Sequence, residues 1–219
     1  MIRTETFAAW RNEWEWTAVA VRAYGGKVGP YSIEAPATED ELQAVEAHLG
    51  LRLPTAFREV LSVFAKRTDL AWRIRQANDL APIPAISDGN IGWDIDELLA
   101  CDVARRSYAD IYPEDATTWD HKLAFLYLPN GDLLALALDR PGVPVVYLDH
   151  EGGDFHGRVL GPDFPAFITQ WSAVGGCGPE SWVLERVTGA DGIDLDTVDA
   201  VSWREWRATF ARLNSRGHR

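Results

Sequence analysis

The chain has 219 residues, a formal net charge of −12 and an apolar fraction of 47%. This composition is typical of a folded globular protein and excludes an intrinsically disordered one. The negative charge argues against a nucleic-acid-binding protein, which needs a cationic surface, and no stretch approaches the roughly 20 apolar residues that cross a bilayer.

The first predicted helix runs from Glu5 to Tyr24 and ends at Gly25 and Gly26. Its apolar residues recur every three or four positions, as in a helix packed along one face. They are Phe7, Trp10, Trp14, Thr17, Val21 and Tyr24. A loop is expected at 27–37. We assign residues 1–37 to an N-terminal helical extension that packs on the rest of the chain.

Two short helices are predicted between Thr38 and Phe64. Thr38 and Glu41 have the spacing of a capping box, which satisfies free backbone N–H groups at a helix start. Gly50 is placed to end this helix in the left-handed conformation. Pro54 then suits the start of the second helix, because its missing N–H group has no partner there in any case.

The next segment combines a strand, a loop and a helix. Residues 70–75 alternate apolar and basic residues, which predicts a half-buried strand. The prolines at 82 and 84 and the cluster 87–90 predict a loop and a turn. Asp94 and Glu97 can cap a helix that runs to about Tyr108.

The clearest β pattern lies between Lys122 and Leu148. The apolar runs 122–128 and 132–138 are joined by a turn containing Asn130 and Gly131, and this dipeptide strongly favours a hairpin. A third strand follows at 143–148. Short connections between neighbouring strands predict an antiparallel meander, so the fold class is α+β.

Helices are predicted again towards the end of the chain. One spans 162–172 with Asp163 as its cap, and a short one spans 180–187. Ser202 and Glu205 have capping-box spacing and are expected to open the last helix. We assign residues 176–219 to a C-terminal helical extension that packs on the core, so that the whole chain forms one globular unit.

The order of these motifs resembles the SUKH superfamily, which includes bacterial immunity proteins and fungal regulators of cell-wall synthesis. The resemblance covers roughly Thr38 to Trp171, and we assign residues 38–175 to a SUKH-like core. It implies an antiparallel sheet packed with an N-terminal helix pair and C-terminal helices. The matching residues are Glu46, Leu49-Gly50, Leu53-Pro54, Phe57, Val60-Leu61, Gly131-Asp132, Asp149-His150, Phe164 and Phe167.

The motifs of common enzymes are absent from the sequence. Cys101 and Cys177 are too few for a disulfide framework and lack metal-ligand spacing, which is consistent with a reducing cytoplasm. There is no Gly-x-Ser-x-Gly nucleophile and no phosphate-binding glycine loop. The one segment with metal-binding character is Asp149–His156, where carboxylates and two imidazoles share a glycine-rich turn; a solvated turn explains it better. We expect no cofactor and no metal.

Acidic residues are concentrated between Asp94 and Asp120, where eight acids and two arginines carry half of the net charge. From composition alone, a solvated helix face explains them. Under the family resemblance, they suit a surface that attracts a basic partner. The acids are Asp94, Asp96, Glu97, Asp102, Asp110, Glu114, Asp115 and Asp120.

The resemblance implies a binding protein that is not an enzyme, and the cysteine content indicates that it works in the cytoplasm. Its partner would be a cognate protein toxin of basic, nuclease type, which it would neutralise by stoichiometric occlusion. A general regulatory interaction module and a metal-dependent hydrolase using Asp149–His156 are the alternatives. We expect no binding to nucleic acid or membranes, and a monomer or weak homo-oligomer. The candidate contacts, chosen by charge and expected exposure, are Asp94, Asp96, Asp139, Asp149, Glu151 and Asp154, with Trp72 and Trp119 as aromatic anchors.

Overall fold

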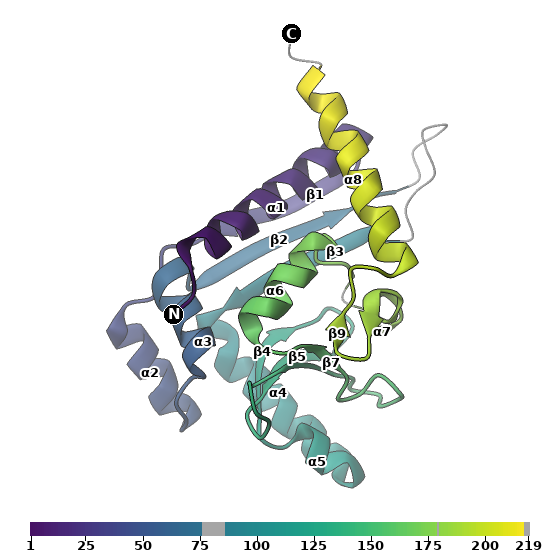
Figure 1. Cartoon of the computed structure of the whole chain (residues 1–219). Coiled ribbons are helices and arrows are strands. Elements are labelled where there is room, and N and C mark those ends of the chain that lie inside the picture. The colour runs from purple at the N-terminus through teal and green to yellow at the C-terminus, as the bar shows by residue number, and fades with distance from the viewer. Residues whose placement is uncertain (76–85, 179, 217–219) are drawn as a thin grey trace.

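The computed structural model describes residues 1–75, 86–178 and 180–216, with the side chains of the last helix described as far as Phe210. Figure 1 shows the helices arranged around the sheets. Short 3-10 turns extend several of the helices. The helices are α1 (Thr4–Tyr24), α2 (Glu39–Leu49), α3 (Thr55–Glu59), α4 (Leu98–Ile111), α5 (Ala116–Trp119), α6 (Phe164–Ala173), α7 (Ser181–Leu184) and α8 (Val198–Arg216).

The strands form two main antiparallel sheets, and a small third sheet pairs β8 (Thr188–Gly189) with β9 (Gly192–Ile193). Sheet A has the order β1-β2-β3, and sheet B has the order β4-β5-β6-β7. The α+β class and the predicted meander are confirmed. The bounds are β1 (Lys27–Ile33), β2 (Arg67–Arg73), β3 (Asp88–Asp94), β4 (Lys122–Tyr127), β5 (Leu133–Ala137), β6 (Val145–Leu148) and β7 (Val159–Gly161).

The helix signals around Gly50 are also confirmed. The Thr38 hydroxyl accepts a hydrogen bond from the Glu41 N–H, and the Glu41 carboxylate accepts one from the Thr38 N–H at 2.7 Å. Gly50 has a left-handed φ of +68°. The Lys66 ammonium and these cap bonds hold the pKa of Glu41 at about 2. The second helix begins at Thr55, with Pro54 at its N-cap, and continues as a π-helical turn over Val60–Phe64.

Two segments expected to be irregular are strands. The predicted loop at 27–37 contains β1, which pairs with β2 as the edge of sheet A. Its exposed polar residues and Pro30 fit an edge strand, where a missing N–H group is tolerated. The predicted turn at 87–90 contains the start of β3. Gly89 is needed there because a side chain would collide with the Trp72 indole, 2.5 Å from the position of an added Cβ.

The last helix begins five residues earlier than expected, with Thr197 rather than Ser202 as its cap. Helix α8 starts at Val198, so Ser202 and Glu205 lie within it and do not form a capping box. The Thr197 hydroxyl accepts a hydrogen bond from the Ala200 N–H at 3.3 Å, which places the cap before the helix. Trp203 stacks on Trp72 of sheet A with ring centres 4.7 Å apart, so α8 packs on the core.

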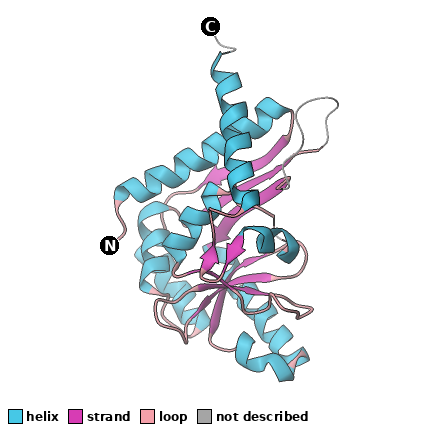
Figure 2. Cartoon of the chain, turned by 45° about the vertical axis from the view of Figure 1, so that its right-hand side comes forward, coloured by secondary structure: helices cyan, strands magenta, loops and turns pink. Residues whose placement is uncertain are grey.

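Each of the two main sheets is covered by its own helices (Figures 1 and 2). Helices α1 and α8 pack on sheet A through buried tryptophans, including Trp14 against Trp93. Helix α4 packs on sheet B through a separate apolar cluster that includes Cys101, Ala124 and Ala135. The outer face of sheet A, which carries Ala71 and Asn90, borders a surface hollow.

Phe164 of α6 joins the main structural units at the centre of the core. Its ring centre lies 5.4 Å from Trp93 of β3, 5.1 Å from Phe125 of β4 and 4.7 Å from Phe57 of α3. The pairs with Trp93 and Phe125 are edge-to-face, and aromatic pairs of this kind contribute about 0.5–1.5 kcal/mol each beyond the burial of area. The Phe164 side chain therefore connects sheet A, sheet B and helix α3.

We predict that Phe164→Ala lowers the free energy of unfolding by about 3–5 kcal/mol, because it leaves a cavity where the sheets meet. Trp182→Ala is the matched control, since this aromatic side chain is 58% exposed and its loss should change stability by less than about 0.5 kcal/mol. Urea unfolding followed by tryptophan fluorescence and circular dichroism measures both. Equal effects of the two substitutions would contradict this role for Phe164.

Candidate functional site

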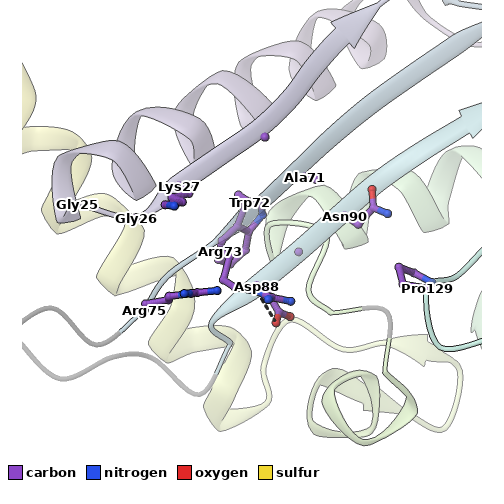
Figure 3. A pocket seen from close by; sticks show the side chains of 12 residues that line it. Gly25, Gly26, Lys27, Ala71, Trp72, Arg73, Arg75, Asp88, Asn90 and Pro129 are labelled. Carbon is purple, nitrogen blue, oxygen red and sulfur yellow. Dashed lines mark ion pairs between the residues drawn. The ribbon is translucent and has the colours of Figure 1, made fainter.

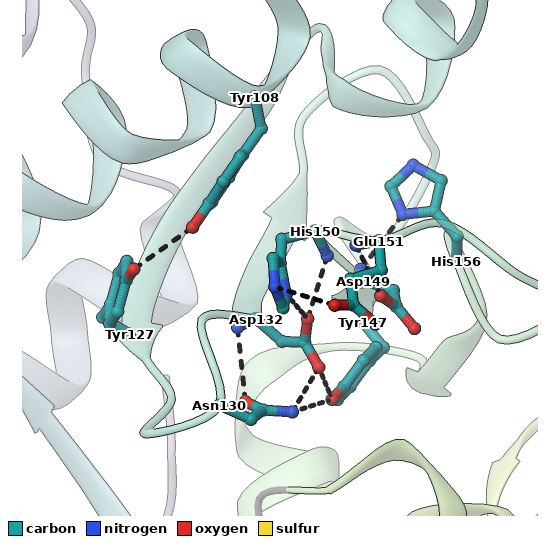
Figure 4. Close-up of polar contacts among 9 residues, drawn as sticks. All are labelled: Tyr108, Tyr127, Asn130, Asp132, Tyr147, Asp149, His150, Glu151 and His156. Atoms are coloured by element: carbon teal, nitrogen blue, oxygen red, sulfur yellow. Dashed lines mark hydrogen bonds and ion pairs between the residues drawn. The ribbon is translucent and has the colours of Figure 1, made fainter. Parts of the chain in front are cut away.

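A polar cluster lies at the end of sheet B where β5 begins and β6 ends (Figure 4). Antiparallel pairing places Leu133 opposite Leu148, so Asp132 lies beside Asp149 and His150 although they are far apart in sequence. Asp132 is the centre of this cluster and is only 3% exposed. Gly131, with a φ of +100°, lets the chain turn tightly beneath the His150 ring.

The Asp132 carboxylate accepts hydrogen bonds from three neighbouring residues. One oxygen accepts from the Tyr147 hydroxyl and from the Asn130 amide. The other accepts from the His150 N–H at 2.9 Å and lies 2.7 Å from His150 Nδ1. Burial, together with the hydrogen bond to Asp132, raises the pKa of Tyr147 well above its usual value. Both carboxylate oxygens are therefore engaged, and the cluster fixes the turn to the end of β6.

The loop that follows β6 has its own set of contacts. The Asp149 N–H donates to His156 Nδ1 at 3.0 Å, and the Asp149 carboxylate accepts from the Glu151 N–H at 2.9 Å. Burial raises the pKa of Asp149 and lowers that of His156. His156 therefore supports the loop through its Nδ1 acceptor, whereas His150 belongs to the Asp132 cluster.

The segment Asp149–His156, considered as an alternative metal site, brings only some of its side chains together. Among the residues that the structure describes, the converging donor atoms come from Asp132, Asp149 and His150 and lie within 4.8 Å of one another. His156 is outside this group. Asp132 already uses its oxygens, and His150 Nδ1 faces Asp132. A metal ion would have to replace these bonds, so the residues present fit a structural cluster better than a metal centre.

The acids of the 94–120 stretch have two different environments. Asp102 is buried on α4 and binds both arginines of the stretch, at 2.9 Å from Arg105 and 2.7 Å from Arg106. Arg105 also donates to the Trp119 carbonyl at 2.7 Å, which ties α5 to α4. Asp94 caps the turn before α4 and pairs with Arg67. The remaining acids are mostly exposed: Asp96, Glu97, Asp110, Glu114 and Asp120.

The structure brings the α4 region next to the loop after β6. The Tyr108 ring of α4 lies 5.7 Å from the His150 ring, and Trp119 of α5 lies 4.7 Å from His156. Two acidic segments that are distant in sequence are therefore neighbours. Of the predicted contacts, Glu151 and Asp154 are exposed on this loop and Asp149 is half-buried.

Asp139 lies apart from these residues. It follows β5, at the opposite end of sheet B, and binds the buried Lys122 ammonium at 3.0 Å. Its position supports an ion pair within the sheet, and the structure does not group it with Asp149.

The two expected aromatic anchors are buried, so their predicted exposure is wrong. Trp72 is 3% exposed, donates to the Gly175 carbonyl at 2.7 Å and borders a hollow of about 440 Å³ with Lys27, Arg73 and Arg75 (Figure 3). Trp119 is 1% exposed beneath Tyr108 and His156. Both rings pack in the interior of the protein. The sequence alone does not distinguish a tryptophan that packs there from one that contacts a partner at the surface.

A family model described as the SMI1 / KNR4 family (SUKH-1) matches residues 36–170 of the chain. The chain belongs to this family. SUKH-1 proteins are generally immunity or regulatory proteins rather than enzymes, and the family is associated with binding of partner toxins. No curated protein matches the chain. No helix in the described parts of this SUKH-1 protein has the length and apolarity to span a membrane.

For this SUKH-1 protein, we predict that Asp132→Ala lowers the free energy of unfolding by about 2–3 kcal/mol, because it removes the buried carboxylate that accepts hydrogen bonds from the Tyr147 hydroxyl and the His150 N–H. Asp154→Ala, in the exposed part of the neighbouring loop, is the control and should be nearly neutral. Chemical denaturation measures both changes. A neutral Asp132→Ala would show that the cluster does not stabilise the fold.

A second prediction concerns metal binding. Because the Asp132 oxygens are engaged, Zn²⁺ or Mn²⁺ at tenfold excess should leave the thermal unfolding midpoint unchanged. Differential scanning calorimetry with and without the ion measures this. A rise in the midpoint that His150→Ala abolishes would contradict the expectation and favour the metal-dependent hydrolase.

Proposed function

We propose that this SUKH-1 protein is an immunity protein that binds a cognate bacterial toxin domain and neutralises it by stoichiometric occlusion. The observation that carries the proposal is the juxtaposition of two acidic segments, α4–α5 and the loop after β6, through the Tyr108–His150 and Trp119–His156 contacts. Membership of a family associated with toxin binding supports it.

The charge of this surface favours a basic partner, of which a nuclease-type toxin is the best example. A nuclease needs a cationic cleft to hold its substrate. An acidic protein is drawn to such a cleft by long-range attraction, which raises the association rate, and covering the cleft prevents substrate entry. Inhibition of this kind requires a rigid complementary surface and no reactive group on the immunity protein.

The partner can be sought first in the reading frame next to the gene. Expression of its product alone should arrest growth of the host cell, and co-expression of this chain should restore growth. A neighbouring product that copurifies without toxicity would instead favour the regulatory interaction module. Residence in the cytoplasm and a monomeric or weakly associated state are parts of the same proposal, measurable by cell fractionation and analytical ultracentrifugation.

We predict that Glu151→Lys with Asp154→Lys lowers the association rate with the toxin by about tenfold at low ionic strength and flattens its salt dependence. Asp149 is left unchanged because its carboxylate holds the Glu151 N–H, so its replacement would also disturb the loop. Stopped-flow fluorescence between 20 and 500 mM salt measures the rates.

The control for this experiment has the same change in charge. Glu15→Lys with Glu205→Lys alters exposed acids on α1 and α8, which pack together away from α4 and α5 (Figure 1). This variant should lose far less of the association rate. If both variants behave alike, only the net charge matters and the loop is not part of the interface.

A further inference from the structure

Helix α4 distributes its residues in an unusual way. A helix on the surface of a globular protein normally places apolar residues inside and charged residues outside. In α4, the charged pair Asp102 and Arg105 is buried, with Leu98 and Cys101, against sheet B. On the outside, Leu99, Val103 and Ile111 are 44%, 61% and 59% exposed. We call these three side chains the α4 stripe.

Leu99 and Val103 form the centre of the α4 stripe. They are four positions apart and are therefore neighbours on one side of the helix, whereas Ile111 lies about two turns further on, beyond the exposed Ser107. A shallow groove of about 670 Å³ runs beside Leu99 and Val103 and is also lined by Asp96, Ala100, Ala104, Ser107 and Tyr108. Single exposed apolar residues are ordinary, but an adjacent pair beside a groove, with a third on the same helix, is typical of an interaction surface.

Acids border the stripe at both ends. Asp96 and Glu97 precede the first turn of α4, whereas Asp110 and Glu114 accompany its last turn and the following segment, and all four are exposed. Arg106 is also exposed on α4 and shares Asp102 with Arg105, so these three groups keep one positive charge, which the four border acids outnumber. The surface therefore combines an apolar centre with a negative border.

We propose that the α4 stripe is the docking site for an apolar patch on a basic protein, and that lysine or arginine residues of this partner meet Asp96, Glu97, Asp110 and Glu114. This inference rests on the proposed function, because it assigns the toxin contact to α4. An apolar centre surrounded by charges of opposite sign is the usual arrangement of a specific interface.

The acidic border selects among possible occupants. A second copy of this chain would bring equal negative charges together around the stripe, which opposes association. An anionic membrane surface would be repelled in the same way. A protein with basic residues around an apolar patch is the occupant that satisfies both parts of the surface.

Site-specific photo-crosslinking in the native host cell tests the inference. The probe is p-benzoylphenylalanine placed at Val103, with Trp182 of α7 as the control position because it is similarly exposed and aromatic. We expect a crosslink from position 103 to a protein of basic isoelectric point, identified by mass spectrometry, and none to that protein from position 182. A crosslink from 103 to a second copy or to an acidic protein, or no crosslink from 103, would overturn the inference.

Binding measurements with the captured basic protein are a second test of the docking site. Leu99→Ala with Val103→Ala should raise its Kd by about tenfold, mainly through faster dissociation, while circular dichroism shows an unchanged fold. Asp96→Lys with Asp110→Lys should instead slow association at low salt. Unchanged affinity of the Leu99/Val103 variant would reject the α4 stripe as the docking site.

The same material separates this inference from the proposed function. If the captured basic protein does not arrest growth when it is expressed alone, the toxin proposal fails and the docking site stands. If a growth-arresting protein binds this chain but crosslinks only from other positions, the docking site fails and the immunity role stands.

Discussion

The packing of Phe164 between the two sheets is the contact on which the architecture depends. Sheets A and B are separate: within the described residues, no strand of one pairs with a strand of the other. Their relative position is therefore fixed by side chains, and Phe164 contacts both Trp93 and Phe125. Close-packed interiors transmit small displacements because they compress little. A change at this ring would shift sheet B, and with it helix α4, relative to sheet A.

Two polar clusters then fix the proposed binding surface to sheet B. Asp132 holds the loop after β6 through His150, and Asp102 with Arg105 holds α5 against α4 through the Trp119 carbonyl. Both carboxylates are buried, and each of their oxygens has a hydrogen-bond or ion-pair partner, which makes the surrounding geometry specific. A surface that is rigid before binding loses less conformational entropy in the complex, so fewer favourable contacts are needed for a given affinity.

Local sequence patterns predicted much of the fold, and pairing over long distances limited the rest. The capping box at Thr38 and the meander around Gly131 depend on neighbouring residues, and both were predicted. Strand β1 was not, because only its pairing with β2, some forty residues away, makes a polar segment with Pro30 a strand. The final helix was placed too late because Ser202 and Glu205 have capping spacing inside a helix that Thr197 already caps.

The candidate site shows the same limit for individual side chains. The expectation that charged residues are exposed was correct for Glu151 and Asp154. It did not show that Asp102 is buried or that Asp132 is the centre of a cluster. A signal for Asp132 was present, since it follows the turn pair Asn130-Gly131, where side chains often bond to nearby backbone. Trp72 and Trp119 were expected at the surface because tryptophan is common in both cores and interfaces, and only the tertiary packing distinguishes the two.

Helix α4 buries a charged pair and exposes apolar residues, and this arrangement affects both stability and binding. Burying Asp102 and Arg105 is less favourable than burying aliphatic residues of similar size, because both charges lose their hydration. Exposing Leu99, Val103 and Ile111 gives no compensation in the isolated protein, since their apolar surface remains in water. Neither arrangement is needed for α4 to cover sheet B, which an ordinary amphipathic helix would do. Together, the buried pair anchors α5 with its acids, and the exposed stripe leaves apolar area to be buried by another molecule. Binding, rather than folding, is therefore the process in which this side of α4 loses its contact with water.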